Sequence, residues 1–196
     1  MAPFGLDDLE VLSELAIDTW RSGVDRDWSV PAGTVEWTCF NTAAHAVDTT
    51  FAPAFFLSSR RQHAYPPFAD LRPLPGATPA DLIDCLRSAA TILHAVITTA
   101  PPDARAIIRR WPQAQTAGRE DFAPRGALEL ILHTYDIASG LQVPFEPPRD
   151  LCERLAVHTE GWWPTESEYE PTGDAWADLL LRHGRPPGAT PDGAAR

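Results

Sequence analysis

A carboxylate and an imidazole stand four residues apart in one segment of the sequence. Glu129 and His133 occupy positions i and i+4 of a stretch with helical periodicity. Side chains at this spacing project from one helix face about one turn apart, so they could bind a single metal ion. Asp136 could accept the second N–H of the His133 ring, and Arg125 extends the same stripe. A solvated helix face would carry the same residues, so the pattern alone leaves both interpretations open.

His45 is a third candidate ligand, in a predicted helix over about residues 38–60. Its neighbours on the same face are small and polar, in a segment that is otherwise apolar: Asn41, Thr42, Asp48 and Thr49. Such neighbours favour a wet cavity inside a bundle over a face in bulk solvent, which would carry Glu and Arg. An ordinary surface or core histidine is the alternative.

The other histidines are weaker candidates. They lie in a proline-rich loop, beside core positions, or near helix ends, where an imidazole can interact with the helix dipole: His63, His94, His158 and His183.

Composition excludes several classes of function. The formal net charge of −11 argues against nucleic acid or an anionic membrane as a partner. No apolar run reaches the roughly 18 residues of a membrane span, and the acidic start MAPFGLDDLEVL is not a signal peptide. We therefore expect a cytoplasmic protein with a small-molecule substrate.

The reactive side chains available are few. All 16 cationic residues are arginine, so a Schiff-base lysine and a P-loop lysine are excluded. The cysteines are odd in number and widely spaced, which indicates reduced core residues and not a disulfide framework or a thiolate zinc site: Cys39, Cys85 and Cys152.

Apolar spacing of three and four predicts an all-α protein, because several amphipathic helices bury their faces most simply in a bundle. Thr78 with Asp81 is typical of a helix start, and Gly140 of a helix end. One domain is expected over residues 1–187, with a disordered tail over 188–196. The helices are predicted over residues 6–24, 38–60, 78–100, 124–140, 148–160 and 174–183.

Three stretches together resemble a known family. They are DWSVPAGTVEWTCFNTAAHAVD (27–48), ALELILHTYDIASGL (127–141) and WADLLLRHGRPP (176–187), which resembles a closing LLxxxGRxP pattern. In this order they are similar to the N-terminal domain of the mycothiol-dependent maleylpyruvate isomerases, within the DinB-like superfamily of metal-binding bundles. The resemblance covers roughly residues 5–187 and implies an up-down-down-up four-helix bundle, here with additional short helices.

The resemblance also implies a metal site. Carried over position by position, the ligands are His45, Glu129 and His133, and the metal is a divalent ion, zinc first and nickel second. Three protein ligands would leave room for water or substrate, as in catalytic sites. The resemblance is compatible with a homodimer. The isomerase itself has an additional sterol-carrier-type domain that helps complete its active site, so the resemblance implies the site more than that particular activity.

Three functions are compatible with such a site. The first is a transferase or isomerase that uses a small thiol such as mycothiol as co-substrate and acts on an electrophile. Asp48 or Asp136 could then move protons or orient ligands, and Arg125 or the pair Arg60-Arg61 could bind a substrate carboxylate or form ordinary salt bridges. The second is a metal-activated hydrolase, and the third is a non-catalytic metal-binding or oligomerisation module.

Overall fold

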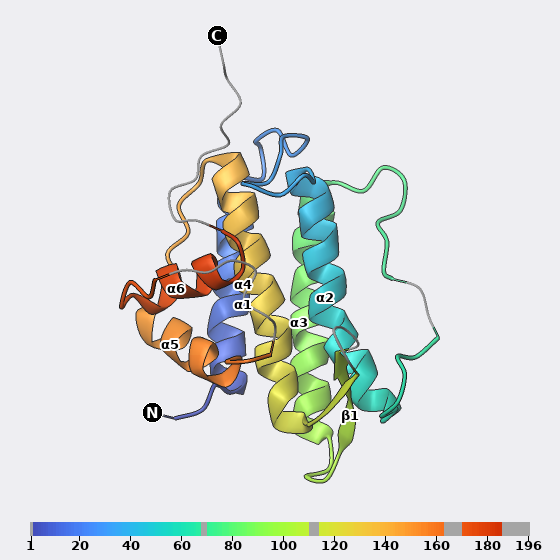
Figure 1. Ribbon diagram of the computed structural model, residues 1–196. Coiled ribbons are helices and arrows are strands. Elements are labelled where there is room, and N and C mark those ends of the chain that lie inside the picture. Colours follow the sequence, from blue (N-terminus) through green and yellow to red (C-terminus); the bar gives the residue numbers. More distant parts are fainter. Residues whose placement is uncertain (1, 68–69, 110–113, 163–169, 186–196) are drawn as a thin grey trace.

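Four long helices form a bundle in this computed structural model, which describes residues 2–67, 70–109, 114–162 and 170–185. The helices are α1 (Leu6–Ser22), α2 (Cys39–Ser59), α3 (Pro79–Thr99) and α4 (Phe122–Leu141). In Figure 1, α1 and α4 run upward while α2 and α3 run downward. Both α1 and α2 pack against α3 and against α4. The predicted all-α, up-down-down-up bundle is thereby confirmed.

The helix starts follow from local chemistry. The Thr78 hydroxyl accepts a hydrogen bond from the Asp81 amide, and the Asp81 carboxylate accepts one from the Thr78 amide, which forms a capping box at the start of α3. Thr38 accepts from the Asn41 amide at the start of α2. Each cap satisfies an amide that the helix leaves without a partner.

The core lies between the four helices, where Leu12, Leu86, Leu93 and Ile131 are fully buried. Each such side chain contributes about 1.5–3 kcal/mol of transfer free energy on burial. Among the described residues, α3 alone is long and apolar enough to span a membrane by length and composition. Buried helices of bundles meet the same criterion, and α3 turns its leucines into this core.

A small hairpin departs from the sequence-based expectation. Strands β1 (Arg105–Arg109) and β2 (Gln115–Gly118) pair antiparallel, with an irregularity between Ile107 and Arg109. Ala106, Ile107 and Ile108 are all buried, so the strand lacks the apolar–polar alternation that identifies a half-exposed strand. A short 3₁₀ turn, η1 (Arg119–Asp121), leads from β2 into α4.

The predicted end of α4 at Gly140 was wrong. The helix continues to Leu141, and Gln142 takes the left-handed conformation with φ of 56°. A Cβ at position 140 would lie 2.4 Å from the Pro31 oxygen and 2.6 Å from Cys39 Sγ. Glycine is needed at position 140 because the loop before α2 approaches α4 closely there, and not because the chain turns.

Two short helices follow, α5 (Arg149–His158) and α6 (Ala175–Arg182), which pack on each other beside the bundle (Figure 1). Arg154 of α5 pairs with Asp8 of α1 at 2.6 Å, and Asp174 caps α6 through the Ala177 amide. The predicted disordered tail over 188–196 lies outside the described residues.

Candidate metal centre

The three candidate ligands come together from two helices. One ligand atom from each of His45, Glu129 and His133 lies within 4.8 Å of the others. Helix α2 supplies the first, and α4 supplies the other two from adjacent turns of one face. The long contact between α2 and α4 sets the distance between the two imidazole rings, whose centroids are 5.0 Å apart. Two imidazoles and a carboxylate are a donor set suited to zinc and other first-row divalent ions.

Asp136 fixes the orientation of the His133 ring. Its Oδ2 lies 3.0 Å from Nδ1 of His133, so Nε2 of that ring is directed to the Glu129 side, 3.5 Å from Glu129 Oε2. Asp136 is fully buried and also accepts hydrogen bonds from Arg185, with Nε–Oδ1 at 2.9 Å and Nη2–Oδ2 at 2.8 Å. A carboxylate behind an imidazole is the usual arrangement of metal-binding histidines.

Glu129 is held from both sides. Arg125 donates to its Oε1 at 2.7 Å, and His133 approaches its Oε2. Burial by itself raises the pKa of Glu129, but the Arg125 charge and the His133 hydrogen bond outweigh it and hold that pKa well below its usual range. The carboxylate is therefore ionised at neutral pH, as a metal ligand must be.

The two imidazoles have opposite electrostatic settings. The pKa of His45 is lowered mainly by burial and, to a smaller extent, by the charge of the nearby His133. Burial also lowers the pKa of His133, but hydrogen bonds to Asp136 and Glu129 outweigh it and the net shift is upward. The indole of Trp37 packs edge-on against His45, with centroids 5.0 Å apart.

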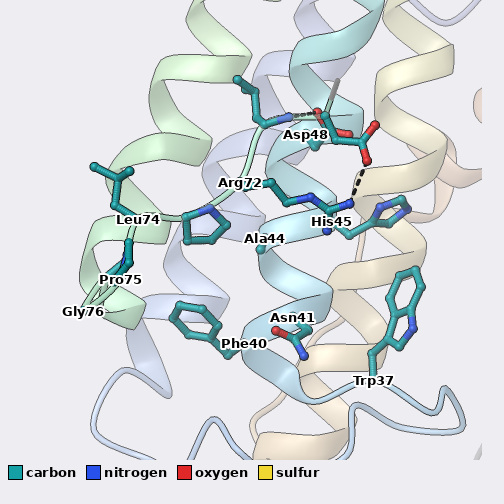
Figure 2. Close-up of a pocket in the computed structure, with 14 residues that line it drawn as sticks. Trp37, Phe40, Asn41, Ala44, His45, Asp48, Arg72, Leu74, Pro75 and Gly76 are labelled. Carbon is teal, nitrogen blue, oxygen red and sulfur yellow. Dashed lines mark hydrogen bonds and ion pairs between the residues drawn. The ribbon is translucent and has the colours of Figure 1, made fainter. Parts of the chain in front are cut away.

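A groove of about 820 Å³ opens beside His45 (Figure 2). One wall is the start of α2 with Phe40, Asn41 and Asp48, and the other is the segment 70–77. The Leu71 amide donates to the Asp48 carboxylate at 2.9 Å and ties this segment to α2. Figure 2 shows Arg72 reaching over the groove towards His45. Burial raises the pKa of Asp48.

The residues predicted to move protons, orient ligands or bind a carboxylate lie in different places around the cluster. Asp48 lines the groove one turn beyond His45, whereas Asp136 is enclosed between His133 and Arg185, which suits orientation and not proton transfer to a substrate. Arg125 forms its ion pair with Glu129.

Arg60 and Arg61, the alternative candidates for binding a substrate carboxylate, lie away from the cluster. They follow the far end of α2, 15 residues beyond His45, or about 22 Å along the helix. Arg72 is the arginine at the groove, paired with Asp70 at 2.8 Å and largely exposed. Arg185 lies in the LLxxxGRxP pattern, but no spacing indicated that it or Arg72 reaches the site, because residues outside α2 and α4 do so only through the fold.

The cysteines do not join the site. Cys39 and Cys152 are buried, as expected, whereas Cys85 is exposed on α3, contrary to the prediction of a core residue. Burial raises the pKa of Cys39 to about 11 and that of Cys152 to about 12. Neither thiol is therefore a thiolate at neutral pH.

The fold and this site define an up-down-down-up four-helix bundle with a two-histidine, one-glutamate cluster at one side. Comparison with known proteins agrees. The family model described as the mycothiol maleylpyruvate isomerase N-terminal domain matches residues 14–138. This chain belongs to that family.

Two solved structures share the fold. One is the mycothiol-dependent maleylpyruvate isomerase, with 15% identity, a TM-score of 0.57 and coverage of 87% of this chain and 77% of that one. The other is a histidine-to-alanine variant of the same enzyme, with 14% identity, a TM-score of 0.55 and the same coverage. No curated protein matches the chain in sequence.

Proposed function

We propose that this protein binds one divalent metal ion, zinc first and nickel second, through His45, Glu129 and His133. We further propose that it uses this ion in a small-thiol-dependent transfer or isomerisation of a small electrophile. The observation that carries the proposal is the approach of three suitable donor atoms within 4.8 Å, beside a groove of about 820 Å³.

The residues around the cluster fit a metal ion. Asp136 holds the His133 ring through Nδ1, and Arg125 holds the Glu129 carboxylate through Oε1, so one nitrogen and one oxygen are left on the side that faces His45. A divalent ion bound there would act as a Lewis acid and lower the pKa of a coordinated thiol towards neutrality.

An external thiol suits this site better than a cysteine of the chain. Cys39 and Cys152 are buried with raised pKa values, and Cys85 lies on α3, which supplies none of the three candidate ligands. The family name points to mycothiol as the co-substrate.

The groove would take the parts of the thiol or electrophile that do not react. Trp37 and Phe40 offer apolar surface beside His45, and Asn41 offers amide hydrogen bonds. Asp48, one turn from His45 and with its pKa raised by burial, can hold or release a proton close to where the reacting atoms would lie.

The first test is metal content. The purified protein, its His45→Ala variant and a His63→Ala control are compared by elemental mass spectrometry after incubation with zinc and desalting. His63 is exposed in the loop after α2, which makes it a histidine control away from the cluster. We expect about one metal ion per chain in the wild type and the control, and its loss in His45→Ala. No stoichiometric metal in the wild type would overturn the proposal.

The second test is catalysis. The metal-loaded protein is incubated with mycothiol and electrophilic unsaturated diacids, and thioether adducts and isomers are followed by liquid chromatography with mass spectrometry. Turnover that needs both thiol and metal supports the proposal. Turnover without thiol, with solvent oxygen entering the product, would instead establish a hydrolase. Stoichiometric metal without any turnover would leave a metal-binding module.

A further inference from the structure

The guanidinium of Arg185 reaches the candidate metal centre from outside the four-helix bundle. Arg185 comes shortly after the end of α6, and its side chain is only 13% exposed. Gly184, with φ of 69°, makes the turn after α6, and the Arg185 amide then donates to the Leu180 oxygen at 2.8 Å. This turn and this hydrogen bond fix the backbone of the short segment from which the Arg185 side chain extends to the site.

The contact between Arg185 and Asp136 is two-pronged. Nε lies 2.9 Å from Oδ1 and Nη2 lies 2.8 Å from Oδ2, while Nη1 donates to the His183 oxygen at 2.8 Å. Such a paired geometry fixes the carboxylate plane as well as its position, which a single hydrogen bond would not do. Asp136 has a side-chain exposure of 1%, so its carboxylate is stabilised by the protein groups that pair with it and not by bulk solvent.

Asp136 passes this constraint to a candidate ligand. The same Oδ2 that Arg185 contacts lies 3.0 Å from Nδ1 of His133, and the opposite nitrogen of that ring faces Glu129. The Asp136 contact keeps a proton on Nδ1, so Nε2 is the nitrogen of this ring that would bind a metal once its own proton has left. The family model ends at residue 138, so the residue that completes this chain of contacts lies 47 positions beyond the matched region.

We propose that Arg185 is a positioning residue for the metal centre: its guanidinium holds Asp136, Asp136 holds the His133 ring, and metal affinity therefore depends on this guanidinium. This inference rests on the proposed metal site. It assigns to the Gly184-Arg185 pair after α6 a part in the chemistry of the site, in addition to any part in the packing of α6.

The test compares Arg185→Met with a control that weakens the same segment elsewhere. Methionine keeps much of the apolar stem and removes the guanidinium. The control, Asp174→Ala, removes the N-cap of α6, where Asp174 accepts from the Ala177 amide at 2.8 Å, and leaves Asp136 untouched. Arg185→Lys keeps the positive charge and serves as the second variant if Arg185→Met does not fold.

The readout is the Kd for zinc, measured by competition with a chromophoric chelator, together with the melting temperature of the metal-free protein. We expect Arg185→Met to weaken zinc binding by roughly 10- to 100-fold, the usual effect of losing an outer partner of a ligating histidine. Arg185→Lys should retain an intermediate affinity. Asp174→Ala should lower the melting temperature and leave the Kd unchanged.

A third readout needs no metal. Long-range ¹H–¹⁵N spectra of the metal-free protein report which nitrogen of the His133 ring carries the proton, with His133→Gln for assignment. We expect the Nδ1 resonance of His133 to shift in Arg185→Met, because its hydrogen bond to Asp136 is disturbed, and to stay unchanged in Asp174→Ala. If the wild type bound no zinc, the proposed function would fail, and this spectrum would still decide whether Arg185 sets the His133 ring. An unchanged Kd and an unchanged ring in Arg185→Met would overturn the inference and leave Arg185 as an anchor of α6 only.

Discussion

His45 and His133 have ring centroids 5.0 Å apart, yet the two helices that carry them provide different surroundings. On α4, His133 lies between two carboxylates that are themselves paired with arginines. On α2, the His45 ring lies against the indole of Trp37 and beside the groove. The pKa of His133 is raised and that of His45 is lowered.

This difference indicates a division of roles. The α4 side is held by ion pairs that fix direction, which suits ligands that must be ready before a metal arrives. The α2 side is held by packing and is open to the groove, which suits the ligand next to an exchangeable substrate. Four experiments test whether the two sides differ in this way.

The largest effect on metal binding is expected for Glu129→Gln on the α4 side. It removes one candidate ligand and leaves the Arg125 guanidinium beside two imidazoles without its carboxylate. We expect zinc affinity to fall at least about 100-fold, and the metal-free protein to lose about 2 kcal/mol of stability because the partly buried Arg125 guanidinium loses its ion pair with Glu129. Chelator competition and urea unfolding measure the two effects, with Glu10→Gln on the exposed face of α1 as the control. Equal zinc affinity in both variants would remove Glu129 from the site.

Asp136→Asn should come next. It breaks the buried ion pair with Arg185 and the hydrogen bond to His133 Nδ1. We expect a loss of about 3 kcal/mol in the free energy of unfolding, since the Arg185 charge stays buried without its counter-ion. The surface pair of Asp18 with Arg21 gives the control, because Asp18→Asn should cost less than about 1 kcal/mol. A loss no larger than that of the control would mean that α4 is not held by this pair.

The pH dependence of the metal-free protein should separate the two histidines by sign. The folded-state pKa of His133 is raised, so its contribution to stability is complete below the unfolded pKa of about 6.5 and is lost as pH rises through the folded value. The pKa of His45 is lowered, so its contribution is present above about 6.5 and is lost as pH falls through the folded value.

Urea unfolding at pH 5.5, 7.0 and 8.5 in the presence of a chelator measures both contributions. His133→Gln should flatten the alkaline side of the stability profile, and His45→Gln should flatten the acidic side. The same direction of change in both variants would contradict the comparison.

The smallest effect is expected for Trp37→Ala on the α2 side. The indole is 47% exposed and contacts the His45 ring by its edge. We expect less than about 1 kcal/mol of lost stability, since little apolar area leaves the core, and only a few-fold weaker zinc binding. Trp37→Phe keeps a ring beside His45 and should retain the wild-type affinity. A loss as large as that of Asp136→Asn would show that the α2 side is as rigidly organised as α4.

Several elements could be predicted because their causes are local. The Thr78–Asp81 capping box and the Asp174 cap lie within four residues of the amides that they satisfy. The hairpin could not be predicted, because three consecutive buried residues of β1 give no period of two. The end of α4 was predicted wrongly at Gly140 for a related reason. This glycine allows a close contact with Pro31 and Cys39, which are far away in sequence.

The stripe on α4 follows from the amino-acid sequence alone. Once residues 122–141 are helical, the pitch of the helix brings Arg125, Glu129, His133 and Asp136 onto adjacent turns, whatever the rest of the chain does. Only the tertiary structure decided which groups this stripe meets. Packing of α2 against α4 brings His45 to it, the 70–77 segment places Arg72 over the groove, and the turn after α6 brings Arg185 to Asp136. Those contacts join residues tens of positions apart, and their geometry depends on how whole elements fit together, which no local spacing encodes.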